Sequence, residues 1–424
     1  MQRCLPEMNK KLNYIDLFAG AGGLSEGFKK GGYNPIAHVE MDEAACFTLK
    51  TRTAYHYLKD GKKFDEYVKY LKGEINRTQL YSLIPNEQIN SVINLALSDE
   101  NNEEIFRKID IQLESKEVDL IIGGPPCQAY SLVGRSRSID RMQSDPRNHL
   151  YLQYAKYLKK YNPRLFVFEN VLGLRSADGG GYFNKMKEEF SKLGYKVSDF
   201  FLNAKDFGVL QNRKRIILIG HKKELNLSIT DFKQQDNKVY QVNSVFQDLP
   251  KLQAGEGVDK FYYYANPTND YLKQSGIRNG IDVLTQHVSR PHTEQDKEIY
   301  RIAVDKLKNS ERLNYTTLPS RLKTHNNQHS FFDRFKVVDD NAAFAQTVVA
   351  HIAKDGHYYI HPDKEQNRSI SVREAARLQS FPDDYYFEGV KEGKNRTAAF
   401  KQIGNAVPPL MGTTIANKIK KFFK

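Results

Sequence analysis

The chain has 424 residues, and 40% of them are hydrophobic. A chain of this length is longer than a single hydrophobic core usually supports, so we expect two lobes. Three cysteines, at positions 4, 46 and 127, argue against a disulfide framework and suit no zinc site. We expect a reducing compartment, no secretory leader and no membrane span. The formal net charge of +13 favours a polyanionic partner, nucleic acid first.

The first half of the chain alternates short apolar runs with helical patterns. The runs predict strands at 14–18, 36–40, 118–122, 165–168, 195–202 and 215–219, and helices are predicted at 24–29, 149–160 and 182–193. Residues 43–109 are charged and helix-like, with few strand signals. This alternation is typical of an α/β fold, in which helices cover both faces of a mostly parallel sheet.

The pattern changes at about residue 222. From there to about 345 the chain is polar, irregular and rich in Tyr, Asn, Gln and His, which predicts a second lobe built for surface contact. Helical periodicity returns at 372–380 and 410–423.

A glycine-rich turn follows the first predicted strand, with glycines at 20, 22, 23 and 27. Such a turn lets backbone N–H groups approach a ligand, and Glu40, which ends the second predicted strand, can accept hydrogen bonds from ribose hydroxyls. The turn therefore favours a nucleoside-type cofactor. Its spacing is looser than Gly-x-Gly-x-x-Gly, so NAD is less favoured than another adenosine ligand. A glycine turn that binds nothing stays an alternative.

Cys127 lies in a loop, Gly123 to Ser131, that follows an apolar strand and contains two consecutive prolines. A stiff loop on a rigid scaffold can aim a nucleophile at a ligand. The alternative is that Cys127 is a small buried hydrophobic residue.

Two further segments carry charged groups at strand ends. Glu169 ends the apolar run 166–168, where partial burial makes a carboxyl group a usable acid; the alternative is a helix N-terminal or ion-paired residue. Residues 211–215 lead into another strand, and because alternate residues share a face, Gln211, Arg213 and Arg215 are predicted to converge on one site. A paired arginine could then hold Glu169. The alternative is a solvated basic strand end.

Six motifs occur in one order along the chain: Asp16–Gly23, Gly124–Gln128, Glu169–Val171, Gln211-x-Arg213-x-Arg215, Arg373–Pro382 and Gln402–Pro409. Together they resemble the bacterial cytosine-5 DNA methyltransferase family. The resemblance runs from about residue 14 to 415, apart from 43–109 and the middle of the second lobe.

The resemblance implies an α/β, Rossmann-like S-adenosylmethionine-dependent methyltransferase sheet with a second, smaller target-recognition domain. The catalytic domain would comprise residues 1–221 and 396–424, with an insertion at about 43–109. The small domain would span 222–395, and its target recognition region would lie at about 245–345. The insertion departs from the family minimum. It would be a surface elaboration or an extra contact with DNA or a partner.

The family uses S-adenosylmethionine as methyl donor and releases S-adenosylhomocysteine. By resemblance, residues 18–23 wrap the methionine part, Glu40 holds the ribose, Met41 packs on the adenine and Asp110 binds the adenine edge. The chain end returns to complete the pocket, so the last helix should pack on the first lobe. The implied cofactor-binding residues are Phe18, Ala19, Gly20, Gly22, Gly23, Leu24, Glu40, Met41, Asp110, Ile111, Pro126, Asn405 and Ala406.

The resemblance also implies the chemistry. The thiolate of Cys127 adds to carbon 6 of cytosine, which activates carbon 5, and Glu169 acts at ring nitrogen 3. Arg215 orients Glu169 and binds the ring carbonyl, with Arg213 beside it, and no metal is required. The cytosine must first be flipped out of duplex DNA. The implied DNA-binding residues are Gln128, Ser131, Arg135, Arg137 and Gln211.

In the second lobe, Asn, Gln, Arg and Lys side chains between 278 and 336 are candidates for reading base edges. We expect a monomer in the bacterial cytoplasm that acts on double-stranded DNA. It could protect host DNA from a restriction nuclease that acts on the same site without direct binding. Three rival hypotheses are cytosine methylation in RNA, a catalytically silent binding protein and, least supported, an NAD oxidoreductase.

Overall fold

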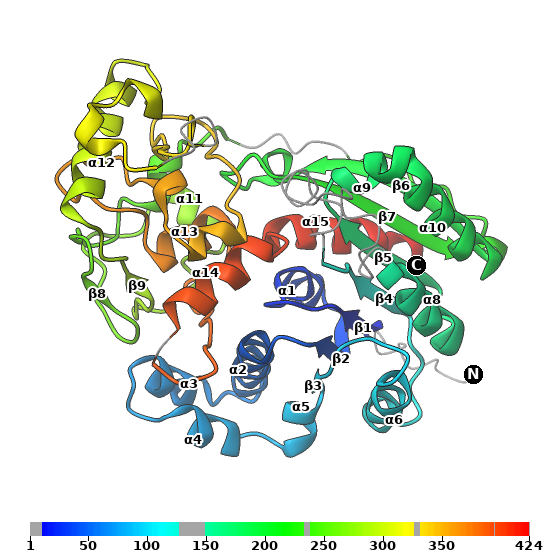
Figure 1. Cartoon of the computed structure of the whole chain (residues 1–424). Helices are drawn as coiled ribbons and strands as arrows, with labels where there is room; N and C mark the ends of the chain where they lie inside the picture. The colour runs from blue at the N-terminus through cyan, green and yellow to red at the C-terminus, as the bar shows by residue number, and fades with distance from the viewer. Residues whose placement is uncertain (1–10, 127–148, 233–237, 326–330, 394, 424) are drawn as a thin grey trace.

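The computed structural model describes residues 11–126, 149–232, 238–325, 331–393 and 395–423. Within them, seven strands form one mixed sheet in the order β3-β2-β1-β4-β5-β7-β6 (Figure 1). All neighbours are parallel except β7, which is antiparallel to both β5 and β6. The strands are β1 (Asn13–Leu17), β2 (Asn34–Glu40), β3 (Val92–Asn94), β4 (Leu120–Gly123), β5 (Leu165–Asn170), β6 (Tyr195–Asn203) and β7 (Lys214–Lys222).

The sheet confirms the predicted mostly parallel α/β fold, and each of the six predicted strands overlaps an observed one. Strand β3 was not predicted. It has only three residues, and it lies inside the charged stretch 43–109. Central strands read as continuous apolar runs because both faces are covered, as in β5, where Leu165 to Phe168 are fully buried.

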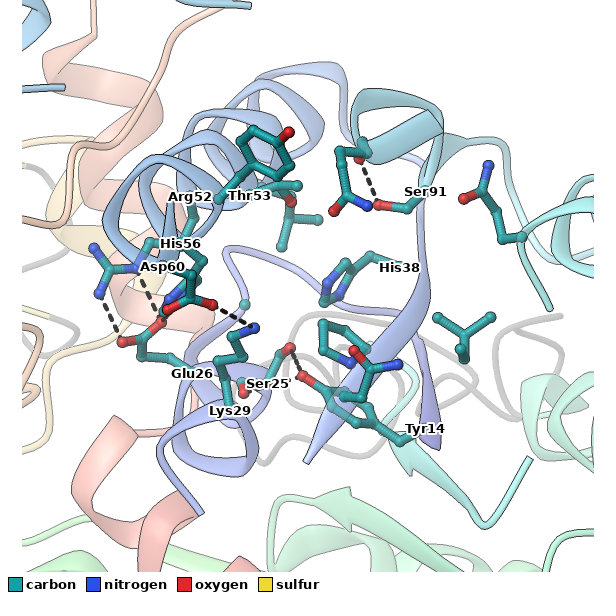
Figure 2. A pocket seen from close by; sticks show the side chains of 18 of the residues that line it. Tyr14, Ser25, Glu26, Lys29, His38, Arg52, Thr53, His56, Asp60 and Ser91 are labelled. Carbon is teal, nitrogen blue, oxygen red and sulfur yellow. Dashed lines mark hydrogen bonds and ion pairs between the residues drawn. The ribbon is translucent and has the colours of Figure 1, made fainter. Parts of the chain in front are cut away.

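Helices α1 (Gly23–Lys30), α2 (Glu43–Asp60) and α15 (Pro409–Lys420) lie on one face of the sheet (Figure 1). Between α1, α2 and β2 lies a cavity of about 550 Å³ lined by polar side chains, including Glu26, Arg52 and His38 (Figure 2). Helix α15 packs closely on α1, which confirms that the last helix returns to the first lobe.

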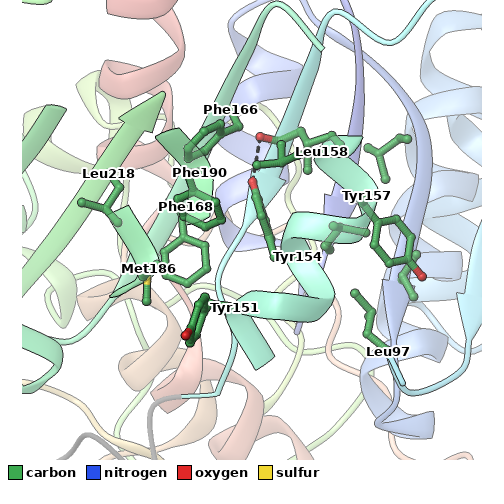
Figure 3. Close-up of a cluster of buried hydrophobic side chains, with 14 of the residues drawn as sticks. Leu97, Tyr151, Tyr154, Tyr157, Leu158, Phe166, Phe168, Met186, Phe190 and Leu218 are labelled. Carbon is green, nitrogen blue, oxygen red and sulfur yellow. Dashed lines mark hydrogen bonds between the residues drawn. The ribbon is translucent and has the colours of Figure 1, made fainter. Parts of the chain in front are cut away.

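Helices α6 (Asn102–Leu113), α8 (Leu150–Tyr161), α9 (Gly173–Ser176) and α10 (Gly181–Lys192) cover the opposite face. Figure 3 shows the aromatic side chains that fill this layer. The hydroxyl of Tyr154 donates to the carbonyls of Ile121 (3.0 Å) and Val167 (3.1 Å), so a large aromatic residue is buried without an unpaired polar atom. The predicted helices at 149–160 and 182–193 are confirmed by α8 and α10.

The second lobe is largely irregular, as its composition predicted. It contains a short hairpin, β8 (Gly257–Val258) with β9 (His287–Val288), and several helices: α11 (Asp270–Gln274), α12 (Glu294–Lys308), α13 (Val372–Leu378) and α14 (Arg396–Asn405). Helices α13 and α15 confirm the helical periodicity seen at 372–380 and 410–423. Helix α14 packs with the core of this lobe, whereas α15 packs on the first, so the chain passes between lobes at the junction of the two helices.

Residues 61–91, called the insert below, contain α3 (Phe64–Leu71), α4 (Arg77–Ser82) and α5 (Asn86–Asn90). Tyr67 and Tyr70 of the insert share a buried cluster with Ile281, Val283 and Tyr386 of the second lobe. The insert therefore forms contacts within the molecule, as a brace between the two lobes (Figure 1). Among the described residues, no helix is long and apolar enough to cross a membrane.

Candidate active site

The carboxyl ends of four parallel strands meet at one edge of the sheet. Leu17, which ends β1, is paired with Val39 of β2 and with Gly123 of β4, and Gly123 is paired with Phe168 of β5. The glycine turn, Glu40, Glu169 and residues 124–126, called the proline turn below, therefore lie along this edge. In α/β proteins this edge is where ligands bind, and the sheet brings together most of the residues that the motifs pointed to.

The glycine turn is held in an unusual backbone conformation. Phe18 has a φ of +56°, which is rare for a residue with a side chain, and Gly20 and Gly22 have φ values of +54° and +77°. The backbone N–H of Gly20 donates to Glu40 Oε2 at 2.8 Å. A Cβ placed on Gly20 would meet no atom within 4 Å, so this part of the turn faces open space.

Glu40 holds two backbone donors at once. Its Oε2 accepts from Gly20, its Oε1 accepts from the N–H of Asp42 at 2.8 Å, and burial raises the pKa of the carboxyl group. Each oxygen keeps a further lone pair that a ribose hydroxyl could use. Met41, the next residue, is 67% exposed and offers an apolar surface beside the turn. These residues fit an adenosine ligand.

The N-terminus of α1 adds a place for an anionic group. Its cap residue is Gly22, which has no side chain to cap the helix, and within the described part of the chain no side chain accepts from the first-turn N–H groups. Such a helix start can bind a carboxylate. The methionine part of S-adenosylmethionine carries one, so the cradle fits the cofactor that the motifs imply.

Gly22, Gly23 and Leu24 are buried, and the glycines permit close packing. A Cβ on Gly23 would lie 2.1 Å from the carbonyl oxygen of Val407 and 3.3 Å from the Cβ of Ala406. The segment that contains Asn405 and Ala406 therefore reaches the glycine turn from the far end of the chain, as expected. Asn405 is exposed at the end of α14.

Glu169 and Arg215 form a close ion pair at the same edge. Arg215 Nε lies 2.6 Å from Glu169 Oε1, and the two side chains are only 11% and 14% exposed. This confirms the predicted pairing of an arginine with Glu169. Gly124 packs directly on Glu169: a Cβ there would lie 2.0 Å from its carbonyl oxygen and 3.1 Å from Oε2. The proline turn and the acid are therefore in direct contact.

Asn170 fixes the start of the proline turn. Its Nδ2 donates to the carbonyl of Pro125 at 3.2 Å, and its Oδ1 accepts from the N–H of Val171 at 2.9 Å. Pro126 is exposed at the end of this described segment. The predicted nucleophile and four predicted DNA contacts lie outside the described residues: Cys127, Gln128, Ser131, Arg135 and Arg137.

The predicted convergence of Gln211, Arg213 and Arg215 is wrong. Gln211 is fully buried: its Nε2 donates to the carbonyl of Leu378 (3.0 Å) and its Oε1 accepts from the N–H of Val348 (2.9 Å). Gln211 is therefore placed to join the lobes rather than to touch DNA.

Arg213 is also fully buried, and its Nη1 and Nη2 donate to the carbonyls of Val348 (2.7 Å) and Gly404 (3.0 Å). These contacts hold the start of β7 against the second lobe and α14. Only Arg215 of the three reaches Glu169.

The assignment of Asp110 and Ile111 to the cofactor pocket also needs correction. Both lie near the end of α6, which starts beside the carboxyl end of β3 and runs back towards the start of β4. Ile111 is 59% exposed, and Asp110 binds Lys160 (2.9 Å) and Tyr161 (3.0 Å) of α8. Asp110 and Ile111 therefore lie towards the amino ends of the strands, away from the carboxyl ends where the other site residues gather.

Asn94, rather than Asp110, lies beside Glu40 and Met41. It ends β3, and its Nδ2 donates to the carbonyls of Glu40 (3.2 Å) and Met41 (3.1 Å). Leu95 follows it and packs, partly buried, against the core. The available signal was the short apolar run Val92–Ile93 followed by a polar residue, which the charged surroundings obscured.

The cavity of Figure 2 is distinct from this edge. Of the predicted site residues only Gly22 lines it, and its lining extends to Asn34 and Pro35 at the start of β2. In the second lobe, several candidate base-reading arginines already have partners inside the lobe. Arg278 pairs with Asp248 (2.7 Å), and Arg290 donates to the carbonyls of residues 352–354.

Comparisons with known proteins agree with this geometry. The family model described as C-5 cytosine-specific DNA methylase matches residues 12–78 and 87–421. The chain is 42% identical to the type II methyltransferase M.Bpa9945I of Bacillus paralicheniformis, covering 96% of this chain and 98% of the relative. It is 32% identical to the type II methyltransferase M.DdeI of Desulfomicrobium norvegicum, covering 97% and 89%.

Among solved structures, a prophage-encoded DNA modification methyltransferase from E. coli matches with a TM-score of 0.62 and 22% identity. The match covers 97% of this chain and 99% of that one and supports the fold. The methylase model spans both lobes, the glycine turn and the Glu169–Arg215 pair. The chain therefore belongs to the C-5 cytosine-specific DNA methylase family and is an S-adenosylmethionine-dependent DNA (cytosine-5-)-methyltransferase.

Proposed function

We propose that this methyltransferase modifies a flipped-out cytosine in a specific short duplex sequence through a covalent adduct with Cys127. The observation that carries the proposal is the Glu169–Arg215 ion pair, which lies against the glycine at the start of the proline turn. This turn leads directly to Cys127, and the glycine turn lies on the same edge of the sheet. The acid, the described residues that lead to Cys127 in the sequence and the glycine turn thus share one edge of the sheet.

The residues divide the chemistry between them. The thiolate of Cys127 forms a bond to carbon 6 of cytosine, and the ring electrons move towards carbon 5. Glu169 holds a proton at ring nitrogen 3, which stabilises the charge that develops there. Arg215 fixes the Glu169 carboxyl group and can donate to the ring carbonyl.

When bound, S-adenosylmethionine supplies an electrophilic methyl group to carbon 5 and leaves as S-adenosylhomocysteine. A base then removes the carbon 5 proton, the bond to Cys127 breaks, and the thiolate is restored. We place the ribose at Glu40 and the adenine beside Met41. Asn94 would hold these two residues in position, because its side chain donates to the backbone carbonyls of Glu40 and Met41. Phe18 to Gly20 and the helix start would face the methionine part.

We further propose that the second lobe, residues 222–395 together with α14, reads the target sequence, with the recognition region at about 245–345. The relatives named above are type II methyltransferases, and both match over nearly their whole length. By analogy the chain would protect bacterial DNA in the cytoplasm from a nuclease that cuts the same sequence, acting as a monomer on the duplex. The nuclease need not bind it.

Covalent trapping tests the proposal. A pool of random duplexes that contain 5-fluorocytosine is incubated with the enzyme and S-adenosylmethionine, because fluorine at carbon 5 blocks the final elimination. The wild-type protein should form complexes that survive denaturing gels, and sequencing the trapped DNA gives the target. Cys127→Ala should form none. Trapping that persists in Cys127→Ala would overturn the nucleophile, and trapping of 5-fluorocytosine tRNA but not duplex DNA would favour an RNA substrate.

A further inference from the structure

Tyr385, from the second lobe, contacts the glycine turn of the first. It follows α13 in the chain, is 1% exposed, and donates its hydroxyl to the carbonyl of Ala21. A Cβ on Gly22 would lie 3.0 Å from the same hydroxyl oxygen, and Phe381 packs on the Tyr385 ring with centroids 4.8 Å apart. The backbone of the turn is thus held by a side chain more than 360 positions away.

Arg52 of α2 packs against the Tyr385 ring and also binds α1. Its Nε and Nη2 donate to the two carboxylate oxygens of Glu26 at 2.9 and 2.6 Å (Figure 2). Its Nη1 donates to Asp384 Oδ1 at 2.8 Å. The guanidinium lies 4.7 Å from the centre of the Tyr385 ring. Glu26 lies in the first turn of α1, directly after the glycine turn. The turn is therefore tied to the 384–385 segment on both sides.

The same segment is anchored in the second lobe by buried charges. Asp383 accepts from Arg377 at 2.6 Å, Arg377 donates to Asp248 at 2.5 Å, and Asp248 also pairs with Arg278 at 2.7 Å. All four side chains are at most 10% exposed. Such a buried network holds its members in one arrangement, so the position of Tyr385 is set by the second lobe.

We infer that Tyr385 is a positioning residue for the cofactor, supplied by the second lobe to hold the glycine turn in its binding conformation. Phe18 is in the left-handed region, and such a residue persists only where its surroundings fix it. Without the hydroxyl, the turn can relax in the free protein, and the cofactor must then bind a less populated conformation. The inference rests on the proposed placement of the cofactor at this turn.

Tyr385→Phe tests the inference, and Tyr386→Phe is its matched control. Tyr386 is the next residue and is also 1% exposed, but its hydroxyl donates to Asp259 (2.9 Å) and accepts from Asn395 (2.8 Å), away from the turn. Calorimetric titration of each protein with S-adenosylhomocysteine gives the dissociation constant without turnover. Tyr385→Phe should weaken binding by about 5- to 30-fold, as for one lost buried hydrogen bond, and Tyr386→Phe by less than about 2-fold.

Steady-state kinetics should show the same division. The KM for S-adenosylmethionine should rise in Tyr385→Phe while the KM for DNA stays at the wild-type value, whereas general loss of structure would change both. Equal dissociation constants for Tyr385→Phe and wild type would overturn the inference, as would equal losses in the two variants.

Glu40→Ala separates this failure from failure of the proposed cofactor site. If Glu40→Ala abolishes binding of S-adenosylhomocysteine and Tyr385→Phe leaves it unchanged, the proposed cofactor site is supported and the positioning role of Tyr385 is wrong. If neither variant changes the dissociation constant, the cofactor does not bind at the glycine turn, and both proposals fall.

Discussion

At the scale of single residues, the contact between Glu169 and Arg215 makes a sharp kinetic prediction. Glu169→Gln keeps the shape of the side chain but removes its ability to transfer a proton. We expect single-turnover methyl transfer to slow by about 10²- to 10⁴-fold, the usual contribution of a general acid, while the dissociation constant for S-adenosylhomocysteine is unchanged. Transfer of a radiolabelled methyl group to DNA measures the single-turnover rate, and calorimetry measures the dissociation constant. A rate within tenfold of wild type would remove Glu169 from the mechanism.

Glu388 makes a second residue-scale prediction, because it is fully buried where the insert meets the second lobe. Its Oε1 accepts from Thr51 (2.7 Å) and from Tyr70. Among the described residues its Oε2 accepts no hydrogen bond and lies 3.7 Å from Arg77 Nη1. Burial raises the pKa of Glu388 from 4.5 to about 7.

Between these two pKa values the folded protein holds a proton on Glu388 that the unfolded chain has lost. The free energy of unfolding should therefore fall as pH rises from about 4.5 to 7, with a slope of up to about 1.4 kcal/mol per pH unit from this group. Urea unfolding at a series of pH values gives the free energy of unfolding of wild type and of Glu388→Gln. The difference between the two free energies should change from about pH 4.5 to 7 and be constant above pH 7. Glu392→Gln, an exposed neighbour, serves as control. Parallel profiles for wild type and Glu388→Gln would contradict the prediction.

Residue patterns predicted the Glu169–Arg215 pair but not the surroundings of Gln211 and Arg213. Alternation along an extended segment correctly suggests a shared direction, but these residues lie before β7 starts at Lys214, where the second lobe covers them. The carbonyls that they bind come from residues 135 to 191 positions further along the chain. No local pattern reveals such partners.

At the scale of elements, the crossing of α1 and α15 depends on two glycines. A Cβ on Gly27 would lie 2.4 Å from the backbone of Gly412, whereas a Cβ on Gly412 would lie 3.1 Å from the carbonyl oxygen of Leu24. Gly27→Ala should therefore destabilise the protein by about 2 kcal/mol or more, through overpacking, and Gly412→Ala by less. Thermal unfolding of both variants checks the order. Equal melting temperatures for Gly27→Ala and wild type would show that the helices separate readily.

A substitution of Arg77 tests whether the contacts between the insert and the second lobe stabilise the protein. Its Nη1 and Nη2 donate to the carbonyls of Gly389 (2.8 Å) and Val390 (3.0 Å), and its guanidinium lies 3.6 Å from the centre of the Phe47 ring. Arg77→Ala should cost about 1–3 kcal/mol in the free energy of unfolding. Lys72→Ala, at an exposed position of the same insert, should cost almost nothing. Equal stabilities for the two variants would contradict the brace.

Periodicity predicted long elements well and missed short ones. The six predicted strands and the main helices are present, because each carries several apolar residues at the spacing of its own geometry. Strand β3 has three residues and is preceded by the helices of the insert, so its signal is weak. Missing β3 displaced the predicted adenine-edge residues to Asp110 and Ile111, whereas the strand end places Asn94 beside Glu40 and Met41.

At the scale of the whole molecule, contacts between distant segments of the described chain join the two lobes. Arg213 and Gln211 tie the start of β7 to the second lobe, Tyr385 reaches the glycine turn, and the insert packs on residues 281–283 and 386. Composition predicted two lobes and a polyanionic partner, and the ordered motifs predicted the family. The joints between the lobes were not predictable, because each combines segments that are distant in the chain.

The central claim is that this chain methylates cytosine at carbon 5 in a defined duplex sequence through Cys127. The most direct measurement is bisulfite sequencing of DNA from cells that lack cytosine-5 methylation and express the protein, with Cys127→Ala as control. We predict that cytosines resist conversion in one short sequence context and that the variant loses this protection. Complete conversion of cytosine in cells that contain ample folded wild-type protein would contradict the claim.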